Sequence, residues 1–377
     1  MKRGNGHIHF QTPMHSLRIT AVSTLFLALL FSCSNPGKQP YTMEDYALVE
    51  KIDIHVHLFT EDPAFVALAK EDRFRFLNIA VHSLDEEEMH HRHKTAYAQH
   101  DAQPERVAIA SSFPMANWDE STWKDDTIRY LDSTFAKGAV AVKVWKDIGM
   151  EIKDASGKLV GIDDPKFDPI FAHLTQKDIR LIGHLGEPKN CWLPLEEMTV
   201  KNDQNYFRNH PEYHMYLHPD LPSYEDQINA RDRMLEKNSD LHFMGAHLAS
   251  LEWSVDELAK FLDRFPNAVV DTAARMGHLQ YQSNIDHDRV RNFLIKYQDR
   301  ILYGTDLSTD SETAPEDFIL RARKEWKEDW AYLNTEETIS VAVLDEPVQG
   351  LALPKSVAEK IYHLNAKRMF PSSWKTR

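Results

Sequence analysis

The sequence predicts an α/β fold, a (β/α)8 TIM barrel with long insertions after the fifth and eighth strands. Eight short runs rich in β-branched residues recur along the chain, and amphipathic segments of helical period separate several of them. A chain of 377 residues with 42% hydrophobic composition can also bury one large core. Strands that alternate with helices are typical of parallel βαβ units, and eight of them fit a barrel better than an open sheet. The expected strands are 51–58, 74–82, 106–114, 139–146, 180–186, 242–248, 267–273 and 301–306.

A doubly wound open sheet is the alternative architecture. No GxGxxG or Walker sequence supports it. Two segments between expected strands read clearly as amphipathic helices, "DDTIRYLDSTFAKG" and "SVDELAKFLDRFP". The second opens on Ser254 with the spacing of a capping box to Glu257, which predicts the start of a helix there.

The segment before the first strand predicts export. Residues 19–31 form an apolar run that follows basic residues and is too short to span a bilayer comfortably. The run ends in "LLFSC", which resembles the lipoprotein box of bacterial exported proteins. That resemblance implies cleavage before Cys33 and lipidation of this cysteine. An ordinary cleaved signal with a chance cysteine is the alternative, and Met14 is an alternative start to Met1.

We therefore expect three parts: a signal peptide over 1–32, a tether over 33–49 and the folded domain over 50–371. The domain would lie in the cell envelope, on the periplasmic or outer-membrane face, and touch the membrane only through Cys33. A net charge of −14 argues against a nucleic-acid partner, because proteins that bind a phosphate backbone usually present a basic face. A small molecule is the expected substrate.

The first expected strand, within "KIDIHVHLFT", alternates two kinds of side chain. One set is Asp53, His55 and His57, and the other is Ile52, Ile54, Val56 and Leu58. In a parallel barrel one face of each strand packs on the outer helices and the other points inward. We expect the apolar set to face the helices and the polar set to point inward. The two histidines would then lie near the carboxyl end, where barrel active sites are found, and could bind one metal ion.

Three later strands end in residues of the metal-ligand type. His184 stands in "LIGHLGEP", His247 in "FMGAHLAS" and Asp306 in "ILYGTDLS". Taken singly, such a histidine is more often structural, and such an aspartate often caps a helix. Together with the first strand they place ligands at four strand ends. Histidine and carboxylate ligands suit zinc, with manganese, iron or nickel as alternatives, in one or two ions.

The ordered set of these residues resembles the amidohydrolase superfamily of metal-dependent (β/α)8 barrels. The chain is most similar to the branch that also contains aminocarboxymuconate-semialdehyde decarboxylase. The resemblance covers roughly residues 50–370 and includes "VAEKIYHLNAKRMF", which is similar to the terminal helix of that branch.

The resemblance implies a role for each of these residues. His55, His57 and Asp306 would ligate the metal. His184 would be a further ligand, and His247 would ligate a second metal or act on substrate and water. Asp306 would also take the proton of the attacking water, since a bound cation makes water acidic enough to ionise near neutral pH.

Lys143 in "GAVAVKVWKDIG" is expected to point inward beside Trp145, because the valines of this strand form the opposite row. A buried lysine is costly unless it is paired, neutral or modified. The family resemblance suggests a carbamylated lysine that bridges two metals. A lysine that contacts substrate or forms a salt bridge and a lysine on the outer surface are the alternatives. Lys146 has the opposite parity, and we expect it to be exposed or in a loop.

Three residues are candidates for substrate binding: the inward-facing Trp145, Arg275 and Glu187. Arg275 follows the seventh expected strand, which ends in Asp271, and could form a bidentate contact with a substrate carboxylate. An ion pair between Asp271 and Arg275 that orders the rim is the alternative. Glu187, three residues past His184, could reach metal or substrate or be a plain loop residue.

Two long connections are expected to shape the pocket. Residues 187–225 form an aromatic-rich insertion, and loops of this length in a compact barrel are commonly lids or substrate walls. Residues 308–335 form a charged insertion that would serve as a lid edge or a subunit contact, so a homo-oligomer is one alternative.

The sequence therefore predicts a metal-dependent hydrolase that cleaves an amide, ester or lactone bond. The first alternative is a metal-dependent nonoxidative decarboxylase of a carboxylic acid. The second is a lipid-anchored binding protein without catalytic activity, which the complete ligand set argues against.

Overall fold

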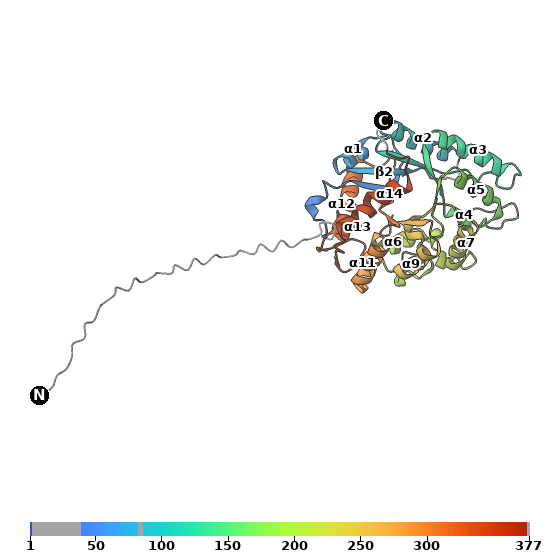
Figure 1. Cartoon of the computed structure of the whole chain (residues 1–377). Coiled ribbons are helices and arrows are strands. Elements are labelled where there is room, and N and C mark those ends of the chain that lie inside the picture. Colours follow the sequence, from blue (N-terminus) through green and yellow to red (C-terminus); the bar gives the residue numbers. More distant parts are fainter. Residues whose placement is uncertain (2–38, 82–85, 375–377) are drawn as a thin grey trace. The chain divides into compact units, whose positions relative to one another are not determined.

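The computed structural model describes Met1, residues 39–81 and residues 86–374 (Figure 1). The predicted signal peptide and Cys33 lie outside these residues, so export and lipidation stay predictions. Within the described part of the chain, no helix combines the length and the apolar character needed to cross a membrane.

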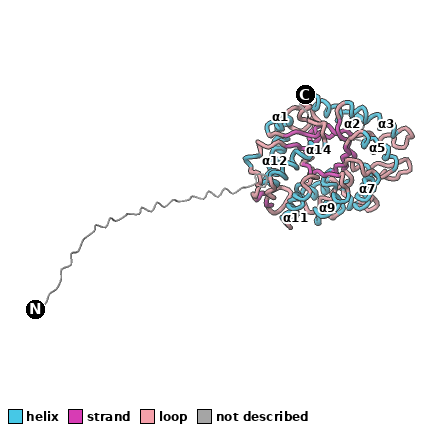
Figure 2. Tube along the Cα trace, viewed as in Figure 1, coloured by secondary structure: helices cyan, strands magenta, loops and turns pink. Residues whose placement is uncertain are grey.

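The strands form one parallel sheet in chain order, from β1 through β8, with β9 beside β1. Figure 2 shows these strands, in magenta, surrounded by helices. The predicted α/β barrel fold is thus confirmed. The strands are β1 (Lys51–Leu58), β2 (Phe74–Ile79), β3 (Val107–Ser111), β4 (Ala139–Val144), β5 (Arg180–Gly183), β6 (Phe243–Gly245), β7 (Ala268–Asp271), β8 (Ile301–Leu302) and β9 (Leu307–Thr309).

The eighth strand differs from the expected 301–306, because it consists of two pieces, β8 and β9. The ladder is not continuous between them: β8 pairs with β7, and β9 pairs with β1. Residues 303–306 make two backbone hydrogen bonds to β1 at this gap. The Ile54 N–H donates to Tyr303 O at 3.1 Å, and the Asp306 N–H donates to His55 O at 2.8 Å.

Most helices alternate with the strands along the chain and lie outside them (Figure 1). Ser254 accepts a hydrogen bond from the Glu257 N–H at the start of α9, as its sequence predicts. The α-helices are α1 (Ala64–Glu71), α2 (Glu86–Ala102), α3 (Trp123–Ala136), α4 (Asp147–Met150), α5 (Asp168–Gln176), α6 (Lys201–Asn209), α7 (Tyr224–Lys237), α8 (Ala246–Ala249), α9 (Val255–Arg264), α10 (Met276–Ile285), α11 (His287–Lys296), α12 (Pro315–Asn334), α13 (Lys355–Glu359) and α14 (Asn365–Met369).

Shorter elements complete the described chain. The insertion after β5 contains η4 (Lys189–Trp192), η5 (Leu195–Glu197), α6, η6 (Pro211–Tyr213) and η7 (Met215–Leu217). The others are η2 (Met43–Asp45), η3 (Pro165–Phe167), the π-helical η8 (Lys360–Leu364) and the antiparallel pair β10 (Thr338–Ile339) and β11 (Val348–Gln349).

The core has an inner and an outer part. Within the parallel sheet, buried apolar residues from every strand except β7 and β9 form one cluster, which must fill the barrel interior, and α14 contributes Ala366 and Met369 to it. A second and larger cluster joins the opposite faces of the strands to the helices. Two faces with different partners are typical of barrel strands.

The first strand does not keep the simple alternation that its sequence suggests. From Asp53 to Val56, β1 spans three residues while β2 spans two, so β1 carries a β-bulge. Ile52 and Ile54 therefore belong to the inner cluster, although we expected them to face the helices. Asp53, expected inside, lies on the outer side and contacts Trp326 of α12. After the bulge the parity is restored, and Val56 and Leu58 join the outer core.

Two segments pack differently from the expectation. Residues 39–49 of the expected tether contact the domain: Tyr41 and Tyr46 are buried, and the Trp330 side chain donates to Thr42 O at 2.9 Å. The folded domain thus begins before residue 50.

Most of 308–335 forms β9 and α12, and Trp326 and Trp330 of α12 are fully buried in the outer core. This segment belongs to the barrel wall more than to a lid.

Candidate metal centre

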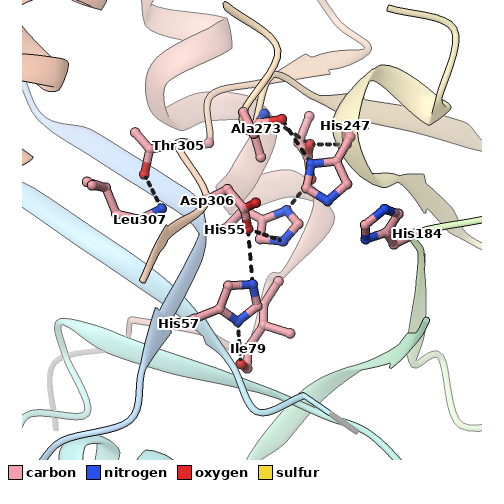
Figure 3. A network of polar contacts seen from close by, with 12 residues as sticks. His55, His57, Ile79, His184, His247, Ala273, Thr305, Asp306 and Leu307 are labelled. Carbon is pink, nitrogen blue, oxygen red and sulfur yellow. Dashed lines mark hydrogen bonds and ion pairs between the residues drawn. The ribbon is translucent and has the colours of Figure 1, made fainter. Parts of the chain in front are cut away.

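Five predicted ligands meet at the carboxyl ends of the strands. His55 and His57 come from β1, His184 follows β5, His247 follows β6, and Asp306 lies between β8 and β9. Figure 3 shows that the side chains of all five lie around one space. The ring centroids of His55 and His247 are 4.8 Å apart, and those of His184 and His247 are 4.2 Å apart.

Asp306 lies closest to the pair from the first strand. Its Oδ1 is 3.3 Å from Nε2 of His55 and 3.1 Å from Nε2 of His57. The ligand atoms of these three residues all lie within 4.8 Å of one another, as a common metal ion would require. Asp306 has a positive φ of 70°, which is uncommon for an aspartate and is typical of strained functional positions.

Three of the histidines use Nδ1 for contacts with the protein. Nδ1 of His55 is 2.8 Å from Asp271 Oδ2, Nδ1 of His57 is 2.9 Å from Ile79 O, and Nδ1 of His247 is 2.9 Å from Ala273 O. Because each acceptor takes the Nδ1 proton, Nε2 is left as the nitrogen with a lone pair. Metal-binding histidines are usually oriented by such contacts.

His184 provides the clearest sign of a ligand. Its side chain is buried, and Nε2 has no hydrogen-bond partner among the described residues. The nearest opposite charge is Oε2 of Glu187, at 3.8 Å. A buried polar atom without a partner is unusual in a folded protein. A metal ion would satisfy it, so these nitrogen and oxygen donors fit a divalent cation.

Burial determines the charge state of the ring nitrogens. It lowers the pKa of His55, His184 and His247 well below the ordinary value of histidine, and nearby charges such as Lys143 act in the same direction on His55. These imidazoles are neutral at pH 7, as metal ligation requires. Burial alone would raise the pKa of Asp306, but the surrounding histidines hold it well below its usual range. Asp306 is therefore an ionised carboxylate.

His247 is placed by a strained turn. Four consecutive residues, His247 through Ser250, have φ between 56° and 59°, although none is a glycine. Left-handed conformations of this kind are costly for residues with a Cβ atom and tend to occur at functional sites. Asp271 stabilises the start of the turn, because its Oδ1 accepts the His247 N–H at 2.7 Å. Asp271 thus contacts His55 and His247 at once.

Lys143 lies inside the barrel, which excludes the alternative of a surface lysine. It is 1% exposed, and its Nζ is 2.8 Å from Nε2 of His55. Burial lowers the pKa of Lys143 to about 8. Its ammonium group also lies over the ring of Trp145, at 5.0 Å from the centroid. The carbamate bridge and the substrate contact remain predictions for this lysine.

A cavity of about 440 Å³ opens beside the centre. Its wall includes four aromatic side chains: Phe59, Trp145, Tyr206 and Phe207. It also includes four basic side chains: Arg92, Lys143, Lys146 and Arg275. Flat apolar surfaces with several cations suit a small, planar, negatively charged ligand. The insertion after β5 supplies Tyr206 and Phe207, in agreement with the expected substrate wall.

Arg275 lines this cavity without a carboxylate partner. It is 7% exposed, Nη1 donates to Ala274 O at 3.0 Å, and Nε finds no hydrogen-bond partner within the described ranges. Among the described residues Arg275 forms no ion pair. The alternative of an ion pair with Asp271 is wrong, because Asp271 contacts His55 instead. A buried guanidinium group in this state is suited to bind an anion from the cavity.

Lys146 and Glu187 form a buried ion pair in the cavity wall. We expected Lys146 to be exposed or in a loop, and it lies in the turn between β4 and α4, although its side chain is not exposed. Glu187 is thus held by a lysine and is not a free loop residue. Arg92 of α2 also lines the cavity, although the sequence suggested a solvated helix face for residues 89–93.

Comparison with known proteins gives one family match and several structural neighbours. A family model for amidohydrolases matches residues 52–372. An uncharacterised TIM-barrel protein from Bordetella bronchiseptica is 16% identical, with 86% of this chain and 99% of that chain covered and a TM-score of 0.47. A 2,6-dihydroxybenzoate decarboxylase from Rhizobium is 14% identical, with coverage of 85% and 98% and a TM-score of 0.48. A 4-oxalomesaconate hydratase from Rhodopseudomonas palustris is 14% identical, with coverage of 85% and 95% and a TM-score of 0.45. No curated protein matches the chain.

Proposed function

Because the chain belongs to the amidohydrolase family, we propose that it is a metal-dependent hydrolase that cleaves an amide, ester or lactone bond of a small anionic substrate. One observation carries the proposal: an ionised aspartate, Asp306, lies against Nε2 of His55 and of His57, beside the unpartnered Nε2 of His184. These are the donors for a cation and the base for a hydrolysis in one place.

His55, His57 and Asp306 would hold the ion, with His184 as a further ligand. Zinc is the proposed metal, because neutral imidazoles and a carboxylate are its common ligands in enzymes. When bound, such a cation acidifies a water molecule and polarises a carbonyl group. The inner cluster of apolar residues below the site keeps bulk water away from that side.

Asp306 would act as the general base. Its low pKa keeps it ionised, and its side chain is 31% exposed, so that it can accept a proton from a water molecule on the cavity side. The same carboxyl group can return the proton to the departing nitrogen or oxygen of the substrate. His247, whose Nδ1 faces Ala273 O, would present Nε2 to the substrate oxygen or to a second ion.

The cavity would recognise the substrate by charge and shape. Arg275 would bind a carboxylate, because its buried guanidinium group forms no ion pair with any described residue. Trp145 would pack against the body of the substrate near His57 and His184. The ring centroids of these histidines lie 6.0 Å and 6.1 Å from the Trp145 ring centroid. The Lys146–Glu187 pair would bound the cavity on the side of the insertion.

The test is turnover by the purified, zinc-loaded protein on panels of lactones, N-acyl amino acids and aromatic carboxylates, in water enriched in ¹⁸O. Hydrolysis puts ¹⁸O into the product carboxylate. Release of CO2 without ¹⁸O in the organic product would replace the proposal by a nonoxidative decarboxylase, which Arg275 would suit equally well. Binding of the panel without any turnover, at full zinc loading, would favour a binding protein.

A further inference from the structure

Asp53 is a buried carboxylate outside the candidate metal centre. It is fully buried on the outer side of β1, and among the described residues it forms no ion pair. Its polar contacts among these residues are hydrogen bonds alone. Burying a polar side chain in such a position is unfavourable unless its contacts compensate, which makes the identity of those contacts informative.

Four donors surround the Asp53 carboxylate. Oδ1 accepts the N–H of His55 at 3.2 Å and the N–H of Thr305 at 3.1 Å. Oδ2 accepts the hydroxyl of Thr305 at 2.6 Å and the indole N–H of Trp326 at 3.3 Å. One of these donors belongs to His55, a candidate metal ligand. Two belong to Thr305, the residue before the candidate ligand Asp306. The carboxylate thus joins the two chain segments that carry His55 and Asp306.

Both segments are irregular where Asp53 binds them. The N–H of His55 lies in the β-bulge, where it is not part of the regular ladder. Thr305 precedes Asp306, whose φ is positive, in the gap between β8 and β9. The Thr305 hydroxyl also accepts the Leu307 N–H at 3.1 Å, at the start of β9 (Figure 3). Backbone groups that the ladder leaves unpaired are therefore satisfied by one side chain and its threonine partner.

We propose that Asp53 is a positioning residue that sets the relative placement of His55 and Asp306 for one metal ion. The inference rests on the proposed function. Without Asp53, the bulge and the left-handed residue would lose the contacts that favour them over a regular, continuous strand. A regular β1 would turn the His55 side chain away from Asp306, because a shift of one residue reverses the face of a strand.

A purely structural role is the competing explanation, since the bond from Trp326 also ties Asp53 to α12. The positioning role and the structural role predict effects from different substitutions. A positioning role depends on Thr305, whereas a role in fastening α12 depends on Trp326. Asp329 provides a comparison: it is a buried aspartate of α12 that accepts the Tyr303 hydroxyl at 2.9 Å and makes no hydrogen bond to His55, Thr305 or Asp306 among the described residues.

The experiment measures zinc affinity of the whole purified protein by competition with a chromophoric chelator, together with the unfolding midpoint of the metal-free protein. The variants are Asp53→Asn, Thr305→Val, Thr305→Ser, Trp326→Phe and Asp329→Asn. The visible absorption spectrum of the cobalt-loaded forms reports the ligand geometry independently of affinity.

We expect Asp53→Asn and Thr305→Val to weaken zinc binding by roughly tenfold to a hundredfold, the size of effect seen when groups that orient metal ligands are removed. Their cobalt spectra should also change. Thr305→Ser keeps the hydroxyl and should restore affinity to within about threefold of the wild type. Trp326→Phe and Asp329→Asn should lower the unfolding midpoint without the change in the cobalt spectrum.

Wild-type zinc affinity and an unchanged cobalt spectrum in Asp53→Asn and Thr305→Val would overturn the inference while the proposed function stands. An equal loss of affinity in Asp329→Asn would also overturn it, in favour of general destabilisation. If the wild-type protein binds no zinc, the proposed function fails, and the positioning role of Asp53 fails with it.

Discussion

Asp271 Oδ2 lies 2.8 Å from Nδ1 of His55, and Oδ1 of the same carboxylate accepts the N–H of His247 at 2.7 Å. Burial raises the pKa of Asp271, while the backbone N–H groups of His247 and Ala273 and the charge of Lys143 favour its ionised form. An acceptor at Nδ1 leaves Nε2 of His55 as the ligand atom. We expect Asp271→Asn to weaken zinc binding by roughly tenfold to a hundredfold, because an amide nitrogen cannot accept this proton.

Chelator competition measures this effect, and Asp178→Asn is the control. The Asp178 side chain is 67% exposed. Among the described residues it makes no contact with the ring nitrogens of the four histidines. Equal zinc affinity of Asp271→Asn and Asp178→Asn would show that Asp271 does not orient His55.

Asp306→Asn should abolish most of the turnover. The amide keeps the shape of the side chain but cannot accept a proton, and general base catalysis typically contributes about 10²–10⁴ in rate. The measurement is kcat for the best substrate of the panel, with the zinc content of wild type and variant brought to the same value first. Turnover within about threefold of the wild type at equal zinc content would exclude Asp306 as the base.

Arg275→Gln should raise KM for substrates that carry a carboxylate. A hydrogen bond to a charged group is worth about 1.5–3 kcal/mol, which corresponds to a rise of roughly tenfold or more. KM for a neutral analogue, such as the methyl ester of the same acid, should change little. Arg129→Gln, at a position with a 70% exposed side chain, is the matched control. The same KM increase for the acid and for its ester would contradict a carboxylate contact.

Asp329 should make stability depend on pH. Burial raises its pKa to about 7 from an ordinary 3.8, with Asp53 and Glu328 adding to the shift and the Tyr303 hydroxyl opposing it. The folded state therefore holds this proton more tightly than the unfolded state. The stabilisation from protonated Asp329 is complete below the ordinary pKa and is lost as pH rises through about 7.

Urea unfolding at pH 5 and pH 8 tests this sign. Asp329→Asn has no such proton, so its free energy of unfolding should improve relative to the wild type between the two pH values. A difference between variant and wild type that is the same at both pH values would contradict the raised pKa.

Much of the site could be predicted from strand ends. The two histidines of β1, together with His184, His247 and Asp306, were identified because parallel strands bring their carboxyl ends to one side of a barrel. The resemblance to a family supplied their order. The facing of Lys143 followed from simple alternation within β4, which has no bulge at that residue in its pairing with β5.

The rest depended on interactions that a single strand does not encode. The bulge of β1 depends on its register against β2, and it moved Ile52 and Ile54 inward and Asp53 outward. The partner of Asp271 is His55 of β1, which is distant from it in the sequence. The short spacing between Asp271 and Arg275 therefore suggested the wrong ion pair. Lys146 lies beyond the end of β4, where the backbone turns and alternation stops.

Metal content tests the central claim most directly. The whole purified protein, dialysed against buffer with zinc and then without it, should retain at least about one equivalent by mass spectrometry of the metal, and the double variant His55→Ala/His57→Ala should retain less than about a tenth of that. Removal of the metal should abolish turnover, and zinc should restore it. Less than about 0.3 equivalents in the wild type, with no gain of activity on adding zinc, would contradict a metal-dependent enzyme.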